Sequence, residues 1–161
     1  MLSKRVMLFA GALAIGLILL ATGNRRDWIV YNDSPSIPVG FYVRVDAGPA
    51  TGSFVTLRAN EVARSYATLR GFTGPQDRFI KRIAASRGVE VCAKGSHVSV
   101  GGLRLVRLRQ DRNGHALPTW DGCAVLRDGE FFVLGDTSDS FDSRYFGVVR
   151  RENIEGVWRQ L

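Results

Sequence analysis

One run of this sequence, FIKRIAA at residues 79–85, places a lysine in a strand-like stretch among apolar neighbours. If the run forms a strand, Phe79 and Ile83 lie on the same face as Lys81 and shield its amine from water. Burial disfavours the charged ammonium and lowers its pKa, whereas arginine keeps its proton in a protein. After Arg26 the chain contains two lysines and 16 arginines, so a lysine here indicates an amine that acts as a base. A snorkelling lysine on an edge strand is the alternative.

Outward from that run, the pattern predicts mostly strands. The 161 residues, 45% of them hydrophobic, fit one domain with an N-terminal appendage. Alternation and turn residues predict strands at residues 40–45, 53–58, 78–85, 89–93, 97–100, 103–108, 124–126, 130–134 and 145–149. Helical spacing predicts one short helix over residues 60–70, capped by Asn60. We therefore expect a mainly β, antiparallel domain whose sheet is partly coiled on itself.

Residues 1–26 have the pattern of a membrane-targeting segment. A basic start precedes an apolar, uncharged run at residues 6–21, and an arginine pair follows it. This run is short for a bilayer span and long for the core of a signal peptide. Residues 21–23 (ATG) would serve as a cleavage site, so a cleaved signal peptide is an alternative. We expect an uncleaved anchor, with residues 27–161 outside the cytoplasm.

The basic character of the chain is concentrated at this segment. The net charge is +7, but four of the 22 basic residues flank the first apolar run and all 15 acidic residues lie after Arg26. The remainder is nearly balanced, so nucleic-acid binding is not expected. One basic stretch contains Arg104, Arg107, Arg109 and Arg112, and it predicts an amphipathic strand with a solvated arginine face.

The two cysteines, Cys92 and Cys123, fit an exported chain. An even number of cysteines outside the cytoplasm favours one disulfide, and two buried free thiols are the alternative. The two histidines, His97 and His115, have no metal-ligand spacing with each other or with the cysteines. No metal site is expected.

A serine-containing loop lies at residues 32–42, NDSPSIPVGFY. Two prolines restrict the backbone around Ser36, and Gly40 permits a close turn. A nucleophile benefits from such a rigid loop, because its oxygen must be held near the reacting carbonyl. The hydroxyl of Ser34, beside the backbone N–H of Ser36, would complete an oxyanion hole. An ordinary Ser-Pro turn is the alternative.

An acidic turn follows at residues 135–147, GDTSDSFDSRYFG. Aspartates and serines at this density form turns through hydrogen bonds from side chain to backbone. Asp142 and Arg144 are placed to form an ion pair that shapes such a loop.

Together these three motifs resemble those of the signal peptidase I-type serine proteases, which use a serine–lysine dyad. The resemblance is strongest to the conjugative-transfer branch, the TraF-type pilin-processing enzymes. That branch has Asn, Ser, Ser, Pro, Gly and Tyr at alternate positions, as this chain has from Asn32 to Tyr42. Residues 81–85 are similar to the lysine box of the superfamily, and residues 135–147 to its last box. Ile37 departs from the ordinary signal peptidases, which have methionine there.

The resemblance implies a role for each motif residue. Ser36 is then the nucleophile, Lys81 the general base, and Ser34 with the Ser36 backbone N–H the oxyanion hole. Three residues support them: Ser140 orients the lysine amine, and Asp142 and Arg144 brace the loop. The implied fold is a partly open β-barrel domain of signal-peptidase type, with one or two short helices, after an N-terminal transmembrane helix. No cofactor is implied.

The resemblance also implies a place and a substrate. The enzyme would lie in the bacterial inner membrane, with its catalytic domain in the periplasm. Its substrate would be a pilin or another exported precursor of a conjugation or type IV secretion system, and either hydrolysis or cyclisation by aminolysis would release the product. A general type I signal peptidase and a non-catalytic, membrane-anchored β module remain alternatives. The sequence does not indicate an oligomeric state.

Overall fold

The structure is a computed structural model that describes residues 26–161. The predicted anchor, residues 1–26, therefore lies outside the described residues except for Arg26. Within the described part of the chain, no helix has the length and apolar character needed to cross a bilayer.

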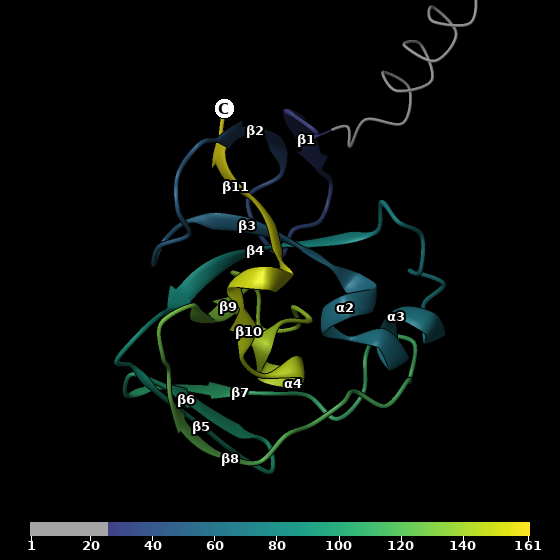
Figure 1. Cartoon of the computed structure of the whole chain (residues 1–161). Helices are drawn as coiled ribbons and strands as arrows, with labels where there is room; N and C mark the ends of the chain where they lie inside the picture. Colours follow the sequence, from purple (N-terminus) through teal and green to yellow (C-terminus); the bar gives the residue numbers. More distant parts are fainter. Residues whose placement is uncertain (1–25) are drawn as a thin grey trace, which may run out of the picture.

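The described strands form two antiparallel sheets, which confirms the mainly β, antiparallel prediction. The larger sheet has the order β1 (Ile29–Asn32), β2 (Gly40–Val45), β11 (Ile154–Gln160), β3 (Phe54–Arg58), β4 (Arg78–Ala85), β9 (Glu130–Leu134) and β10 (Val149–Arg150). The smaller sheet has the order β7 (Leu103–Val106), β6 (His97–Val100), β5 (Glu90–Lys94) and β8 (Gly122–Val125). Figure 1 shows β3 and β4 crossing the middle of the molecule, with the smaller sheet below them.

The helices differ from the predictions in two places. The helix expected over residues 60–70 is two short helices, α2 (Ala59–Val62) and α3 (Arg64–Leu69), separated by Ala63, whose backbone at φ −149° and ψ 52° is not helical. Arg58 rather than Asn60 precedes α2, and no side chain caps that helix. The last short helices, α4 (Ser143–Phe146) and η1 (Arg151–Asn153), flank β10.

The strand expected over residues 145–149 is wrong, because most of that segment belongs to the end of α4 and the turn after it. The Asp142 side chain accepts a hydrogen bond from the backbone N–H of Arg144 and so starts the helix. Gly147, at φ 79°, ends it. A cap at each end therefore overrides the β propensity of the apolar residues between them.

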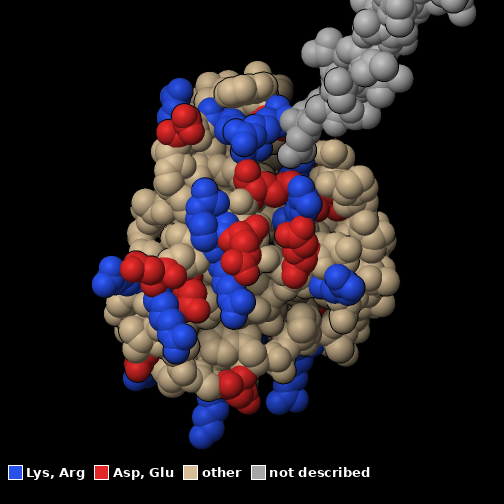
Figure 2. Space-filling view, viewed as in Figure 1, with Lys and Arg blue, Asp and Glu red and all other residues tan. Residues whose placement is uncertain are grey.

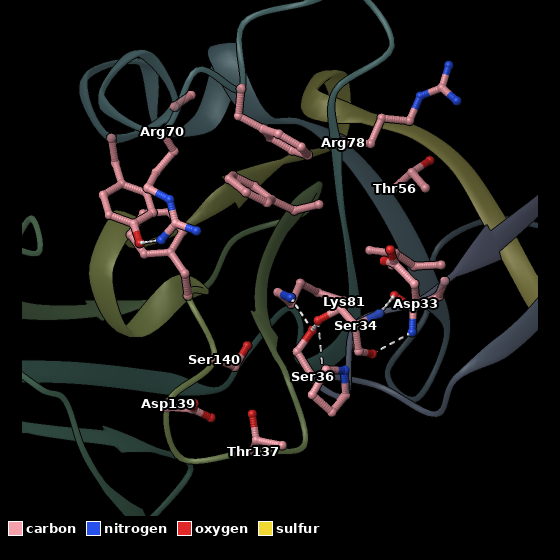
Figure 3. Close-up of a pocket in the computed structure, with 18 of the residues that line it drawn as sticks. Asp33, Ser34, Ser36, Thr56, Arg70, Arg78, Lys81, Thr137, Asp139 and Ser140 are labelled. Atoms are coloured by element: carbon pink, nitrogen blue, oxygen red, sulfur yellow. Dashed lines mark hydrogen bonds between the residues drawn. The ribbon is translucent and has the colours of Figure 1, made fainter. Parts of the chain in front are cut away.

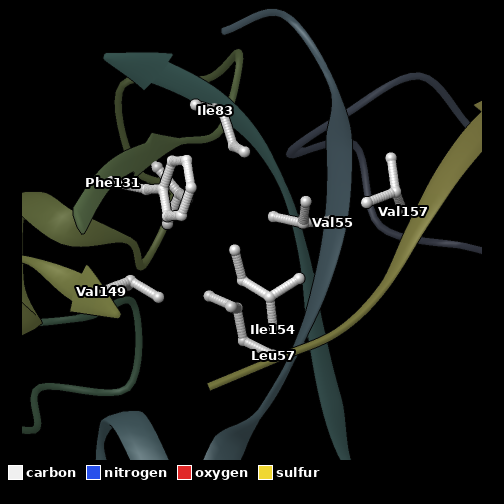
Figure 4. Packing of buried hydrophobic residues seen from close by; sticks show 8 residues of the cluster. Val55, Leu57, Ile83, Phe131, Val149, Ile154 and Val157 are labelled. Atoms are coloured by element: carbon white, nitrogen blue, oxygen red, sulfur yellow. The ribbon is translucent and has the colours of Figure 1, made fainter. Parts of the chain in front are cut away.

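Two hydrophobic clusters form the core. The first lies against the larger sheet, and Figure 4 shows its side chains converging from β3, β4, β9 and β11. The second joins the two sheets, because Ala85 and Phe132 of the larger sheet pack with Val91, Val98 and other residues of the smaller one. Burial of both clusters fixes the position of β4, the strand that carries Lys81.

The smaller sheet contains the predicted disulfide. Cys92 on β5 and Cys123 on β8 lie directly opposite each other and are bonded. The predicted arginine face is wrong at Arg107, which is 3% exposed. Arg107 donates hydrogen bonds to the carbonyls of Gly95 at 2.7 Å and Arg144 at 3.2 Å. It therefore ties the smaller sheet to the loop that contains Arg144.

The surface carries both signs of charge. In Figure 2 the Lys and Arg side chains of the visible face alternate with Asp and Glu rather than forming one broad basic area. Several arginines of residues 26–161 form ion pairs with nearby carboxylates, such as Arg58 with Glu61 and Arg87 with Asp128.

Candidate active site

Ser36 lies in the loop between β1 and β2, and side chains of the flanking strands hold this loop. The Asn32 carboxamide donates to the carbonyls of Ile37 and Pro38, both at 3.2 Å. The Tyr42 hydroxyl donates to the Pro38 carbonyl at 2.6 Å. Ile37 is buried beside Tyr42, so the apolar core also fixes the loop. These contacts explain why Asn32 and Tyr42 accompany Ser36 in the motif, a positioning role that sequence reasoning had not assigned.

Lys81 lies on β4 and is only 5% exposed, as the alternation of the strand predicts. Its Nζ donates to Ser36 Oγ at 2.8 Å, although the two residues are 45 positions apart in the sequence. Burial lowers the pKa of Lys81 from 10.5 to about 8, while the negative charge of Asp142 acts in the opposite direction. An amine with this pKa is partly neutral near pH 7 and can then accept a proton.

Ser34 lies beside the same hydroxyl. Its Oγ donates to Ser36 Oγ at 3.1 Å and accepts from the Ser36 backbone N–H at 3.3 Å. The two donors expected for an oxyanion are thus adjacent; in this structure the Ser36 N–H donates to the Ser34 oxygen, and the Ser34 hydroxyl donates to Ser36 Oγ. Figure 3 shows Ser34, Ser36 and Lys81 side by side on one wall of the pocket.

The acidic turn packs directly against the serine loop. The backbone N–H of Asp136 donates to the Ser36 carbonyl at 2.6 Å. Gly135 makes this approach possible, because a Cβ there would lie 2.7 Å from the Ser36 carbonyl oxygen and 2.1 Å from Ser140 Oγ. Gly135 is a functional residue that sequence reasoning missed, and only its place at the head of the acidic turn hinted at it.

The predicted Asp142–Arg144 ion pair exists and is buried. Arg144 Nε and Nη2 donate to the two oxygens of Asp142 at 2.8 and 2.7 Å. Asp142 also accepts from the Gly135 N–H at 2.8 Å, and Arg144 donates to the carbonyls of Thr137 and Ser138. Because these bonds span the whole turn, the pair holds the loop that meets Ser36.

Ser140 lies at the same pocket and is 4% exposed. Its Oγ makes no hydrogen bond to any described residue, so the geometry does not link it to Lys81. The orienting role predicted for Ser140 stays a prediction.

A groove of about 860 Å³ opens in front of these residues. One wall is β1 with the serine loop, which includes Asp33, Ser34 and Ser36. The other includes residues of α3, the acidic turn and the segment that follows β7. No group of three His, Cys, Asp or Glu side chains within residues 26–161 could hold a metal ion. The arrangement presents a hydroxyl, an amine of lowered pKa and adjacent donors to the groove.

The sequence matches the profile of one family, described as signal peptidase, peptidase S26, over residues 2–160. The chain belongs to this signal peptidase family. The serine loop, the lysine strand and the acidic turn all lie within the matched region, so the resemblance predicted from those motifs is confirmed.

Within the peptidase S26 family, the chain is similar to two plasmid transfer proteins named TraF from Escherichia coli. One is 32% identical and the alignment covers 99% of this chain and 95% of that protein. The other is 27% identical, and the alignment covers 98% of this chain and 96% of that protein. A probable signal peptidase I-2 of Synechocystis is 39% identical, but over 50% of this chain and 36% of that protein. A signal peptidase I structure from Enterococcus faecalis aligns at a TM-score of 0.39 with 23% identity, covering 69% of this chain and 97% of that chain.

Proposed function

We propose that this chain is a serine endopeptidase in which Ser36 attacks a peptide carbonyl and Lys81 is the general base. The observation that carries the proposal is the 2.8 Å contact between Lys81 Nζ and Ser36 Oγ in a buried site. When the amine has lost its proton, the same contact lets it take the Ser36 proton during attack. A non-catalytic β module would have no need to bury an amine against a serine hydroxyl.

The remaining motif residues support the reaction. As the carbonyl oxygen becomes negative, the Ser36 N–H and the Ser34 hydroxyl exchange their present acceptors for it and stabilise it. Asp142 and Arg144 hold the acidic turn against the serine loop, and Ser140 lies beside the reacting groups. The protonated Lys81 then gives its proton to the leaving amine, and an acyl-enzyme on Ser36 remains.

Water or an amine then releases the acyl group. Attack by water gives a linear product, whereas attack by an amine of the same substrate gives a cyclic one. Similarity to the TraF proteins over nearly the whole chain supports a pilin precursor of a conjugation or type IV secretion system as the substrate. We place the enzyme in the inner membrane, with residues 27–161 in the periplasm, where the Cys92–Cys123 disulfide is stable.

A direct test is the processing of a co-expressed pilin precursor, read by intact mass. We expect wild type and Lys94→Arg to process it, while Ser36→Ala and Lys81→Arg do not, because arginine stays protonated. Lys94 is exposed at the end of β5 and is the matched control. A product one water lighter than the linear cleaved chain would identify cyclisation. Processing by both Ser36→Ala and Lys81→Arg would exclude the dyad.

The similarity to a signal peptidase over half of the chain keeps a general type I signal peptidase as the second candidate. It would use the same Ser36 and Lys81 chemistry. A panel of ordinary preproteins separates the two, because a dedicated pilin peptidase would leave most of the panel uncut.

A further inference from the structure

The groove extends past the Ser36–Lys81 pair to a second end, which the proposed reaction does not use. This end is formed by α3 and by a small hairpin at residues 107–117. In the hairpin, the Leu117 N–H donates to the Arg109 carbonyl at 2.9 Å and the Asp111 N–H donates to the His115 carbonyl at 2.9 Å. The second end is therefore an ordered part of the molecule.

Asp111 fixes the hairpin against α3. Its Oδ2 accepts from the Tyr66 hydroxyl and from Arg70 Nη1, both at 3.0 Å. Its Oδ1 accepts from the backbone N–H groups of Asn113 at 2.8 Å and His115 at 3.0 Å. The Asp111 side chain is 8% exposed. Its negative charge is thus shared among several donors at this end of the groove, which Asp111 also lines.

Arg70 is left with unused donors on the groove side. Its side chain is 44% exposed and lines the groove, and its Nη1 is held by Asp111 and the Tyr66 hydroxyl. Arg70 Nε and Nη2 donate to no residue in the described part of the chain. Figure 3 shows Arg70 on the pocket wall across from Lys81 and Ser36. The charge of Arg70 is balanced on one side by Asp111, and its two remaining donor atoms are the groups that a substrate can meet here.

Aromatic rings line the groove beside Arg70. Phe141 stacks on Tyr66 with ring centroids 4.0 Å apart and meets Phe79 at 5.5 Å. Arg112, on the same hairpin, is 82% exposed and pairs with Asp139, so that pair carries no net charge. Arg70 is the less exposed of these two guanidinium groups, and its donors are partly unused within residues 26–161.

We propose that Arg70 is a specificity-determining residue that binds a carboxylate of the substrate peptide while the scissile bond lies at Ser36. A pre-oriented guanidinium with two free donor atoms suits a planar carboxylate. The carboxylate is either the C-terminus of the substrate or an acidic side chain. This inference rests on the proposed peptidase function and adds a substrate class to it.

The test uses peptides that share one cleavable sequence and differ only in charge. One series ends in a free carboxylate, a second in an amide, and a third has an internal glutamate with an amide end, each at several spacings from the cut. We expect wild type to prefer a carboxylate at one spacing by about tenfold in kcat/KM, mainly through KM. Arg70→Gln should remove the preference, and Arg70→Lys should keep part of it. The series that shows the preference identifies the source of the carboxylate.

The amide peptides separate recognition from structure. If Arg70→Gln weakens carboxylate and amide peptides equally, it has only loosened the hairpin, and the inference is wrong. Arg87→Gln, which removes an exposed arginine that pairs with Asp128 and does not line the groove, should leave all peptides unchanged. A wild type without preference at any spacing also overturns the inference.

Binding by the Ser36→Ala variant makes this test independent of turnover. Fluorescence anisotropy of labelled peptides should show tighter binding of the carboxylate form, and the second change Arg70→Gln should abolish the difference. If wild type cuts no peptide but this difference persists, the proposed reaction fails and the carboxylate site stands. If no peptide binds in an Arg70-dependent way, the site is refuted whatever the enzyme cuts.

Discussion

The lowered pKa of Lys81 makes the rate of peptide cleavage depend on pH in a defined way. Burial lowers this pKa from 10.5 to about 8, and each unit corresponds to 1.36 kcal/mol. The ammonium in this 5% exposed side chain is therefore destabilised by about 3 kcal/mol. At pH 7 about one amine in ten is neutral, against about one in three thousand at a pKa of 10.5.

The assay is kcat/KM for a peptide without titrating groups, measured from about pH 5.5 to about pH 9.5. Only the neutral amine accepts the Ser36 proton, so the rate should rise about tenfold per pH unit and level off above about pH 8. Circular dichroism over the same range checks that the protein stays folded. A flat profile, or a rise that continues toward about pH 10, would refute the assignment of Lys81 as the base.

A surface substitution should move this profile without touching the dyad. The negative charge of Asp136 raises the pKa of Lys81, and the Asp136 side chain is 43% exposed in a pair with Arg82. Asp136→Asn should therefore shift the profile to lower pH and raise the rate at pH 7. Its backbone N–H still donates to Ser36. Asp128→Asn, in an exposed pair away from the groove, is the control.

Three further predictions concern stability and packing. The pKa of Lys81 is lower in the folded than in the unfolded chain, so the free energy of unfolding should rise from about pH 8 to about pH 10.5. Lys81→Met should remove this rise and increase the free energy of unfolding at pH 7 by up to about 3 kcal/mol, as measured by urea unfolding. Gly135→Ala should reduce the rate of cleavage at least about tenfold, because the alanine Cβ would lie 2.7 Å from the Ser36 carbonyl oxygen. Full activity with an unchanged melting temperature would contradict this close contact. Replacing Cys92 and Cys123 by alanine should lower the free energy of unfolding by about 3 to 4 kcal/mol in urea, because the disulfide closes a loop of 31 residues. An unchanged urea midpoint would show that the disulfide adds no stability.

Local pattern was sufficient for several elements and for one contact within the acidic turn. The strand at residues 78–85 has the predicted bounds, and buried side chains alternate with partly buried ones from Lys81 to Ala85, as expected for a strand. The Asp142–Arg144 pair also forms as expected, since the two residues are close in sequence and lie in a turn. The helix at residues 60–70 and the strand at residues 145–149 were wrong, because their ends depend on backbone and capping contacts rather than on periodicity.

The sequence analysis did not predict β11, although this strand decides the arrangement of the larger sheet. Ile154, Val157 and Trp158 are buried, and a register shift between Ile154 and Gly156 breaks the alternation that marks a strand. A strand covered on both faces carries little period-two signal. The burial of Arg107 was also not predicted, because it depends on the carbonyls of Gly95 and Arg144, which are far from Arg107 in the sequence.

The sequence by itself singled out the candidate residues: a serine in a restrained loop, a lysine on the buried face of a strand, and an acidic turn. It determined the burial of Lys81 because alternation along a strand is a local property. Only the tertiary structure decided that Lys81 Nζ lies 2.8 Å from Ser36 Oγ. In the larger sheet β11 and β3 lie between β2 and β4, so the serine loop and Lys81 belong to elements that do not pair with each other directly. Pairing between strands far apart in sequence depends on the whole core, and no local pattern specifies it.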